Sequence, residues 1–193
     1  MRKDDQQMAI LSSGESAQLR PLAESDGVLL ATYLGGLSLE TRAKYRPHDF
    51  TGDVAHHLCA QVDDDLSLRL VGVSGAGENM RIIAYFIVHR ASSEDDQRHY
   101  ANYGVVLEPE TDCQFAPSVV DAYQGTGLGS RLMPLCQEIV HGQGYRRTLL
   151  WGRVYISNQQ TVRFHEENDF QVVGRFNPGS GKEDRYDMLA LLV

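Results

Sequence analysis

One segment near the middle of the chain restricts the fold more than any other, namely Val119–Arg131 (VVDAYQGTGLGSR). Two β-branched residues end an apolar run, three glycines follow at alternate positions, and a helical apolar period begins at Leu128. Glycine lets the backbone approach a bulky anion, and the free amides at a helix start attract phosphate oxygens. The segment therefore predicts a strand, a turn that binds a diphosphate, and a helix. The alternative is a glycine-rich turn without a ligand.

Two common phosphate-binding loops fit this turn poorly. A Walker loop requires Lys after its last glycine, but Gly129 is followed by Ser130 and Arg131. A dinucleotide-binding loop requires a third glycine where Ser130 stands, and an acidic residue at the end of the following strand. No clear acidic residue ends a strand near position 150. Both alternatives are weakened, and another nucleotide binder ranks third among the hypotheses.

The segment instead resembles the cofactor-binding signature of the GNAT acyltransferase superfamily, Gln/Arg-x-x-Gly-x-Gly/Ala. Gln124, Gly127 and Gly129 occupy its three defined positions. A second superfamily pattern, Asn-x-x-Ala-x-x-x-Tyr-x-x-x-Gly-Phe, is matched at its two ends by Asn158 and Phe170. Its Ala, Tyr and Gly positions are replaced by Thr161, His165 and Asp169.

The order of predicted elements agrees with this resemblance. Alternation and apolar periodicity predict β-α-α, then consecutive strands, then β-α-β-α-β-β, which is a mixed α/β (α+β) fold. The resemblance implies the GNAT fold, with a central, mostly antiparallel, splayed mixed sheet of six or seven strands flanked by about four helices. We expect a flexible N-terminal segment over residues 1–16 and a single domain over 17–193. Strands are predicted at Tyr103–Leu107, at Phe115–Val120 with its pairing disturbed by Pro117, and at Thr148–Tyr155, with a charged loop at 94–98.

The resemblance implies an N-acetyltransferase that transfers an acetyl group from acetyl-CoA directly to a primary amine. The acceptor is either a small amine or a protein lysine or N-terminus. None of the three cysteines lies in the motif, which disfavours an acetyl-cysteine intermediate. Asn158 either contacts the cofactor or caps a helix. The cofactor-binding residues implied are Val119 and Val120, whose backbone pairs with pantetheine, and Gln124, Gly125, Thr126, Gly127, Leu128, Gly129 and Ser130, whose amides hold the pyrophosphate.

The catalytic residues are less well defined by the resemblance. The general acid of the superfamily is a Tyr at the position of His165, whose imidazolium could protonate the leaving sulfur. Tyr155 is an alternative donor. The position of a Glu base in some relatives holds Gln114, so Glu108, Glu110 and Asp112 just upstream are the candidate bases. These departures favour, as an alternative, a regulatory domain that binds acyl-CoA and has lost catalysis.

The charge distribution limits the partners. Residues 1–120 contain 10 basic and 18 acidic residues, a net charge of −8, whereas residues 121–193 contain 8 of each. This acidic excess disfavours nucleic acid and anionic membranes and is suited to a basic amine acceptor.

Histidine and cysteine spacing predicts no metal site. No apolar run is long enough for a membrane span or a signal peptide, so we expect a cytoplasmic protein, and the resemblance is compatible with a homodimer.

Overall fold

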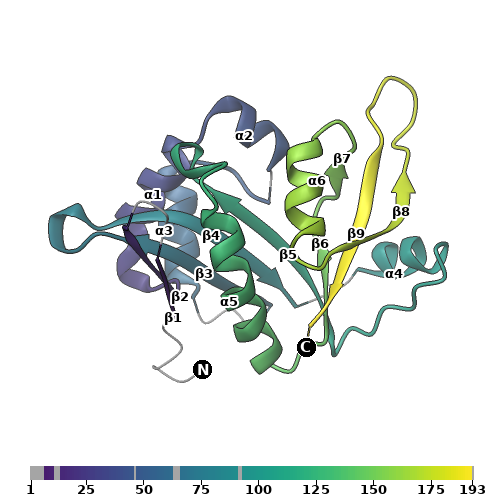
Figure 1. Cartoon of the computed structure of the whole chain (residues 1–193), viewed down its shortest axis with the longest axis horizontal. Coiled ribbons are helices and arrows are strands. Elements are labelled where there is room, and N and C mark those ends of the chain that lie inside the picture. The colour runs from purple at the N-terminus through teal and green to yellow at the C-terminus, as the bar shows by residue number, and fades with distance from the viewer. Residues whose placement is uncertain (1–6, 11–13, 46, 63–65, 91–92, 193) are drawn as a thin grey trace.

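The computed structural model describes residues 7–10, 14–45, 47–62, 66–90 and 93–192. Its sheet consists of two parts, of which the first is called here the N-terminal half-sheet (Figure 1). All neighbouring strands within this half are antiparallel and follow the order of the chain. Its strands are β1 (Gln7–Ile10), β2 (Ser16–Pro21), β3 (Ser67–Ser74), β4 (Arg81–His89) and β5 (Asp112–Val119).

The second part, the C-terminal half-sheet, is built around the last strand. Its strands are β6 (Arg147–Leu150), β7 (Val154–Tyr155), β8 (Gln171–Phe176) and β9 (Arg185–Leu191). β9 pairs antiparallel with all three others. The two halves are joined by one parallel pair, β5 with β6, which gives a nine-stranded sheet.

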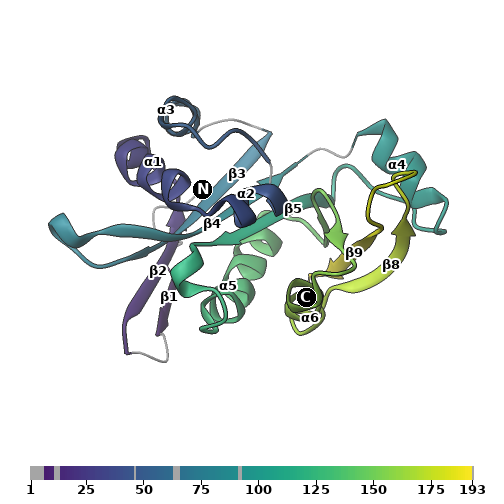
Figure 2. The same ribbon diagram turned by 90° about the horizontal axis from the view of Figure 1, so that it is seen from above.

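Six α-helices cover the two faces of this sheet in the described residues (Figure 2). Three of them, α1 (Gly27–Gly36), α2 (Leu39–Lys44) and α3 (Gly52–Ala60), lie on one face of the N-terminal half-sheet, and α4 (Glu94–Ala101) lies on the same side of the C-terminal half-sheet. On the opposite side lie α5 (Leu128–Gly142) and α6 (Gln159–Glu166).

Alternation along the strands divides the buried side chains between these two faces. On β4, Phe86 and Val88 pack toward α5, whereas Tyr85 and Ile87 pack toward α1 and α3. On β9, Met188 packs in the cluster that contains the α5 and α6 side chains. The intervening residues of β9 face the other side, where Leu189 and Tyr100 form a small cluster under α4. Period-two alternation places both faces against apolar helices, which is why a sheet of this size is stable.

The predicted fold class is confirmed, with differences in the number and bounds of its elements. The sheet has nine strands rather than six or seven, and six helices rather than about four surround it. Residues 94–98 belong to α4 and not to a loop, because Ser93 and Asp96 form a capping box at its start. Residues 103–107 form no strand. The predicted strand 148–155 is interrupted, since the chain turns through Gly152 and Arg153, both with positive φ.

Pro117 does not disturb the pairing of β5 with β4. The amide of Val120 donates to the carbonyl of Ile83 on β4, whereas the carbonyl of Phe115 accepts from Trp151 beyond the opposite edge. Backbone groups of alternate residues in a strand point to opposite edges, so the position of Pro117 faces away from β4. Its missing N–H therefore removes no bond from the β4–β5 ladder, and the predicted disturbance is wrong for this pair. On the edge that Pro117 faces, pairing with β6 ends at Phe115, two residues before it.

The predicted N-terminal segment is partly ordered. Residues 7–10, within the segment 1–16, form β1 and pair with β2. Residues 1–6 and 11–13 lie outside the described residues, as do Asp63–Asp65, which contribute to the acidic excess.

Candidate active site

The two half-sheets separate where β6 ends, and a cleft opens between them. β5 and β6 pair only over Asp112–Phe115 and Arg147–Leu150. β5 then continues to Val119, whereas the other chain turns away at Gly152 and Arg153. The cleft has a volume of about 750 Å³ and is lined by residues of β5, the glycine turn, the β6–β7 connection, α2 and α6.

The edge of β5 that faces this cleft carries unpaired backbone groups. Val119 stands opposite Ala84, and its neighbour Val120 donates to Ile83 on β4. Since adjacent residues of a strand point to opposite edges, the N–H of Val119 points away from β4 and toward the cleft. Its carbonyl accepts from the side-chain amide of Gln124 at 3.1 Å.

The glycine turn presents a second set of backbone amides. Gly125 and Gly127 have φ of 73° and 83°, which side chains rarely adopt, and Gly127 is the N-cap residue of α5. Within the described chain, the amides of Gly127, Leu128 and Gly129 have no backbone or side-chain acceptor. A Cβ on Gly127 would meet no atom within 4 Å, so the space in front of these amides is open.

Gly129 has a different role in the same turn. A Cβ at this position would lie 2.9 Å from Cε2 of Phe164 on α6. The third glycine therefore allows α5 to begin directly against α6, which brings two walls of the cleft together. This packing constraint explains why the last position of the motif needs a small residue.

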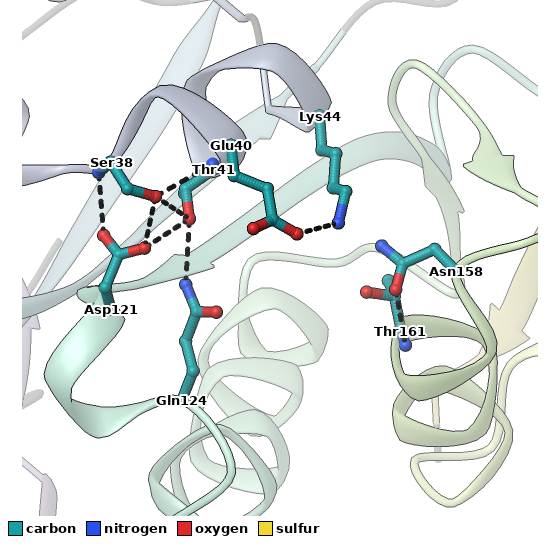
Figure 3. Close-up of polar contacts among 8 residues, drawn as sticks. All are labelled: Ser38, Glu40, Thr41, Lys44, Asp121, Gln124, Asn158 and Thr161. Carbon is teal, nitrogen blue, oxygen red and sulfur yellow. Dashed lines mark hydrogen bonds and ion pairs between the residues drawn. The ribbon is translucent and has the colours of Figure 1, made fainter.

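The turn is tied to α2 by Asp121, as Figure 3 shows. Its carboxylate accepts from the amide of Ser38 at 2.9 Å, from the Ser38 hydroxyl at 2.6 Å and from the Thr41 hydroxyl at 2.7 Å. Burial acts to raise the pKa of the Asp121 carboxyl, but these hydrogen bonds outweigh it and hold the pKa below its usual value. Asp121 is therefore an ionised structural anchor. The Gln124 side chain adds a bond to Thr41 at 3.2 Å.

Asn158 lies across the cleft from this anchor, at the start of α6 (Figure 3). Its side-chain oxygen accepts from the amide of Thr161 at 3.4 Å, as an N-cap residue does. Asn158 also lines the cleft, so the capping role and the predicted cofactor contact are compatible.

His165 lines the cleft from α6 but is only 4% exposed. Burial lowers the pKa of its imidazole from 6.5 to about 3, because the charged form loses its hydration among Phe164 and Phe170. Its Nδ1 atom is buried without a hydrogen-bond partner in the described residues. The imidazolium expected from the sequence is thus disfavoured at neutral pH, and a neutral ring occupies the position.

Tyr155 lines the same cleft from β7. Its hydroxyl oxygen accepts from Nη2 of Arg185 at 3.0 Å, and the guanidinium lies 4.5 Å from the centre of the ring. Because the oxygen already accepts this bond, the hydroxyl hydrogen is directed elsewhere. The arrangement is suited to a proton donor.

The candidate bases lie at the other end of β5. None of Glu108, Glu110 and Asp112 lines the cleft. The Glu108 carboxylate accepts from Thr111, and buried Asp112 is paired with Arg147. Gln114 donates to Asp96 on α4 at 2.7 Å. The cleft opens beyond Phe115, so carboxylates that precede the strand are separated from it by the paired part of β5.

Several cleft residues have no signal in the local sequence. Glu40 and Lys44 on α2 form a pair at 2.7 Å, and Tyr45 follows them. Trp151 and Arg153 come from the β6–β7 connection. Among the acidic residues of the stretch 1–120 that the structure describes, Glu40 is the one that lines the cleft. These positions are brought together only by the separation of the two half-sheets, so motif reading could not find them.

A sequence model described as the acetyltransferase (GNAT) family matches residues 42–170, which is more than half of the chain and includes the glycine turn and α6. The chain belongs to the acetyltransferase (GNAT) family. A search of curated proteins finds no match to it. This GNAT chain is accordingly an acyltransferase.

Solved structures of similar fold agree with this membership. The GNAT domain of S. lividans PAT has a TM-score of 0.73 at 17% identity, over 100% of this chain and 99% of that one. A chimera of spermidine N-acetyltransferase SpeG from Vibrio cholerae and hSSAT has a TM-score of 0.64 at 17% identity, over 91% and 95%. AAC(6')-Ib, solved with paromomycin and acetyl-CoA, has a TM-score of 0.65 at 16% identity, over 90% and 92%.

Among the described residues, no group of three or more His, Cys, Asp or Glu side chains is placed to hold a metal ion. No helix in the same residues is both long and apolar enough to cross a membrane.

Proposed function

We propose that this GNAT protein transfers an acetyl group from acetyl-CoA to a primary amine by direct attack in a ternary complex. The observation that carries the proposal is that free backbone N–H groups reach one cleft from two places, three amides at the start of α5 and the single N–H of Val119 on β5. The amides of α5 suit a diphosphate, and the N–H of Val119 suits a carbonyl of an extended arm that lies along the edge of the sheet.

The cofactor would be held by backbone groups more than by side chains. Of the amides from Gln124 to Ser130, those of Gln124 and Thr126 already donate to carbonyls of the turn. The remaining amides, of Gly125 and of Gly127 to Ser130, including that of Leu128, would surround the pyrophosphate, assisted by the positive end of the α5 dipole. Pantetheine would lie along the cleft edge of β5 beside Val119, where β6 has separated from β5. The backbone of Val120, which the sequence suggested as a second partner, already bonds Ile83 and Tyr123. Asn158 would contact the arm from the other wall.

The reaction requires little covalent chemistry from the protein. The amine nitrogen attacks the thioester carbonyl, the carbonyl oxygen becomes an oxyanion, and the carbon–sulfur bond then breaks. The Val119 N–H would donate to the thioester carbonyl and so stabilise the oxyanion that forms from it. The leaving thiolate takes one proton, for which the Tyr155 hydroxyl is the candidate in the cleft, because a neutral His165 ring that gave up its proton would become an imidazolate. The attacking ammonium must lose one proton, and no lining carboxylate is assigned to this step.

The direct test combines calorimetric titration of coenzyme A with thiol release from acetyl-CoA against a panel of amines. Gly127→Ala places a side chain in front of the amides and in a left-handed conformation, which costs about 1–2 kcal/mol. We expect it to weaken coenzyme A binding at least tenfold. Gly142→Ala, at the far end of α5 with open space around it, is the matched control and should leave affinity unchanged.

The outcomes separate the proposal from its alternatives. Turnover of at least one amine, with affinity lost in the Gly127 variant, supports it. Tight cofactor binding without turnover of any amine would favour a regulatory acyl-CoA sensor. Absence of coenzyme A binding would contradict both.

A further inference from the structure

Arg153 stands out among the cleft residues because its backbone is strained. It lies in the connection between β6 and β7 with φ of 65°, directly after Gly152 at 88°. A non-glycine residue in this region is uncommon and costs about 1–3 kcal/mol, so it persists where surrounding contacts hold it. The contacts that hold Arg153 are polar and buried, and they leave part of its guanidinium in the cleft.

The guanidinium of Arg153 forms an ion pair with Asp187 on β9. Its Nε lies 2.8 Å from Oδ1 of Asp187, which is 1% exposed, and its centre lies 4.2 Å from the ring centre of Phe176. The second carboxylate oxygen of Asp187 is engaged by Nε2 of His99 at 2.8 Å and the hydroxyl of Tyr103 at 3.1 Å. One oxygen of the buried counter-ion is thus hydrogen-bonded, and the other faces Arg153 in an ion pair that lacks hydrogen-bond geometry. The arginine cannot turn away without removing the cation from beside this buried carboxylate.

The outer part of the guanidinium has no such partner. Neither terminal nitrogen of Arg153 contacts an acceptor in the described part of the chain, although the side chain is 23% exposed and lines the cleft. A guanidinium carries five N–H donors in a planar arrangement that matches the two oxygens of a carboxylate. The cleft thus contains an oriented and unsatisfied anion-binding group.

Its position separates it from the phosphate-binding turn. Along β9, Met188 faces α5 and α6, so Asp187 and Leu189 face α4, on the opposite side of the sheet. Arg153 pairs with Asp187 and therefore lies on the α4 side, whereas the glycine turn belongs to α5 on the other side. The phosphates of the cofactor would therefore lie on the α5 side of the gap between the half-sheets, and Arg153 lies on the α4 side.

The other charged residues of the cleft do not provide the same group. On the α2 wall, Lys44 is paired with Glu40, and both side chains are well exposed. Asp121 is saturated by Ser38 and Thr41. The remaining charged lining residues, Arg163 and Glu167, belong to α6 and its end on the cofactor side.

We propose that Arg153 is a specificity-determining residue that binds a carboxylate on the amine acceptor, so that the preferred acceptors are amino acids or other amines carrying a carboxylate. This inference rests on the proposed function, since it names the acceptor class of the same cleft. It differs from the expectation that acidic residues receive a purely basic amine. The reacting nitrogen would enter from the α2 and α4 side, with its carboxylate on Arg153.

The test uses pairs of acceptors that differ by one carboxylate, namely lysine with cadaverine, ornithine with putrescine, and β-alanine with ethylamine. A hydrogen-bonded charge pair contributes about 1.5–3 kcal/mol, which is roughly a 10- to 100-fold preference in kcat/KM. We expect the carboxylate-bearing member to be preferred by at least tenfold. Arg153→Met should reduce the ratio of the two kcat/KM values to about one. Arg153→Lys should leave an intermediate ratio, because lysine keeps the positive charge but cannot donate two parallel hydrogen bonds to a carboxylate.

The matched control is Arg175→Met on β8, an arginine paired with Asp184 that does not line the cleft. It should leave the ratio unchanged. Melting temperatures of all variants separate loss of recognition from loss of folding. Equal kcat/KM within the pairs for the wild-type protein, or an equal loss for both members in Arg153→Met, would overturn the inference.

A second measurement does not depend on turnover. The same pairs are titrated calorimetrically into the protein saturated with coenzyme A, and the carboxylate-bearing member should bind at least tenfold more tightly. If coenzyme A binds but neither member does, the inference on Arg153 fails while the cofactor assignment stands. If coenzyme A itself does not bind, the proposed function fails first.

Discussion

The N-terminal and C-terminal half-sheets are stabilised in different ways. The first is enclosed on both faces by apolar clusters, with Leu70 and Val71 on β3 fully buried toward opposite sides. Both halves contain buried ion pairs, but those that involve the first, Arg20–Asp26 on β2 and Asp112–Arg147 between β5 and β6, lie away from the cleft. In the second, buried Asp187 connects β9 to Arg153, His99 and Tyr103, and Arg153 lines the cleft. Apolar burial is non-directional, whereas a buried ion pair requires defined atoms at defined distances. The N-terminal half-sheet therefore serves as a scaffold, and the C-terminal half-sheet orients groups that face the cleft.

The most severe change should come from removing the polar centre of the C-terminal half-sheet. Asp187→Ala leaves Arg153 without its counter-ion in a buried setting, and we expect a loss of about 3–5 kcal/mol in the free energy of unfolding. Denaturant unfolding measures it. Asp184→Ala is the control, because its partner Arg175 is exposed and such pairs contribute about 0–1 kcal/mol. Equal losses in the two variants would remove the distinction between the halves.

A substitution in the N-terminal half that lowers the free energy of unfolding by a comparable amount should not change the affinity for coenzyme A. Leu132 on α5 is fully buried and packs against Gly72 of β3, so Leu132→Ala should cost about 2–5 kcal/mol. Because the scaffold only carries the cleft, the affinity of the folded protein for coenzyme A should stay within about threefold, since changes below 0.6 kcal/mol are expected. Leu135→Ala, at a half-buried position of the same helix, should cost less. A Leu132 variant that folds but no longer binds would show that the scaffold also shapes the site.

The buried ring of His165 should make the stability of the protein depend on pH. Its folded-state pKa of about 3 lies below its ordinary value of 6.5, so the unfolded chain takes up a proton that the native state excludes. This contribution to stability is present above pH 6.5 and is lost as the pH falls toward 3. At pH 5 the wild-type protein should have lost about 2 kcal/mol from this group, and His165→Phe should lack this loss. Unfolding midpoints between pH 7.5 and 5 provide the measurement.

The same His165→Phe variant tests catalysis. If the ring takes part in the proton transfers of the reaction, turnover should fall at least tenfold, while affinity for coenzyme A stays nearly intact. Unchanged turnover would exclude His165 from the mechanism and leave Tyr155 as the donor.

The smallest effect concerns the cap that ties α2 to the glycine turn. Ser38→Ala removes an N-cap and a bond to Asp121, and it should cost about 0.5–2 kcal/mol. Coenzyme A affinity should fall a few fold, because the turn loses part of its anchor. Ser93→Ala removes the equivalent cap from α4, away from the cleft, and should lower stability similarly without changing affinity. Identical affinities in the two variants would contradict a role for the anchor.

Local signals accounted for much of the fold. The apolar run of Arg81–His89 and the helical period of Leu128–Val140 predict β4 and α5, because β4 is buried on both faces and α5 buries one regular stripe. The failures have local causes too. The charge of residues 94–98 suggested a loop, although Ser93 with Asp96 three residues later is a capping-box pattern. Tyr103–Leu107 is a short apolar run that suggested a strand, yet Val105 and Leu107 pack beneath α4.

The sequence alone determined the strand, the glycine turn and the helix start at 119–131, because these depend on neighbouring residues and on backbone freedom at Gly125 and Gly127. Tertiary structure decided what surrounds them. The anchor of Asp121 comes from Ser38, the counter-ion of Arg153 comes from Asp187, and the neutral state of His165 follows from its burial. Such partners are far apart along the chain, and a side chain's charge depends on solvent exclusion. Both are set only when the two half-sheets come together.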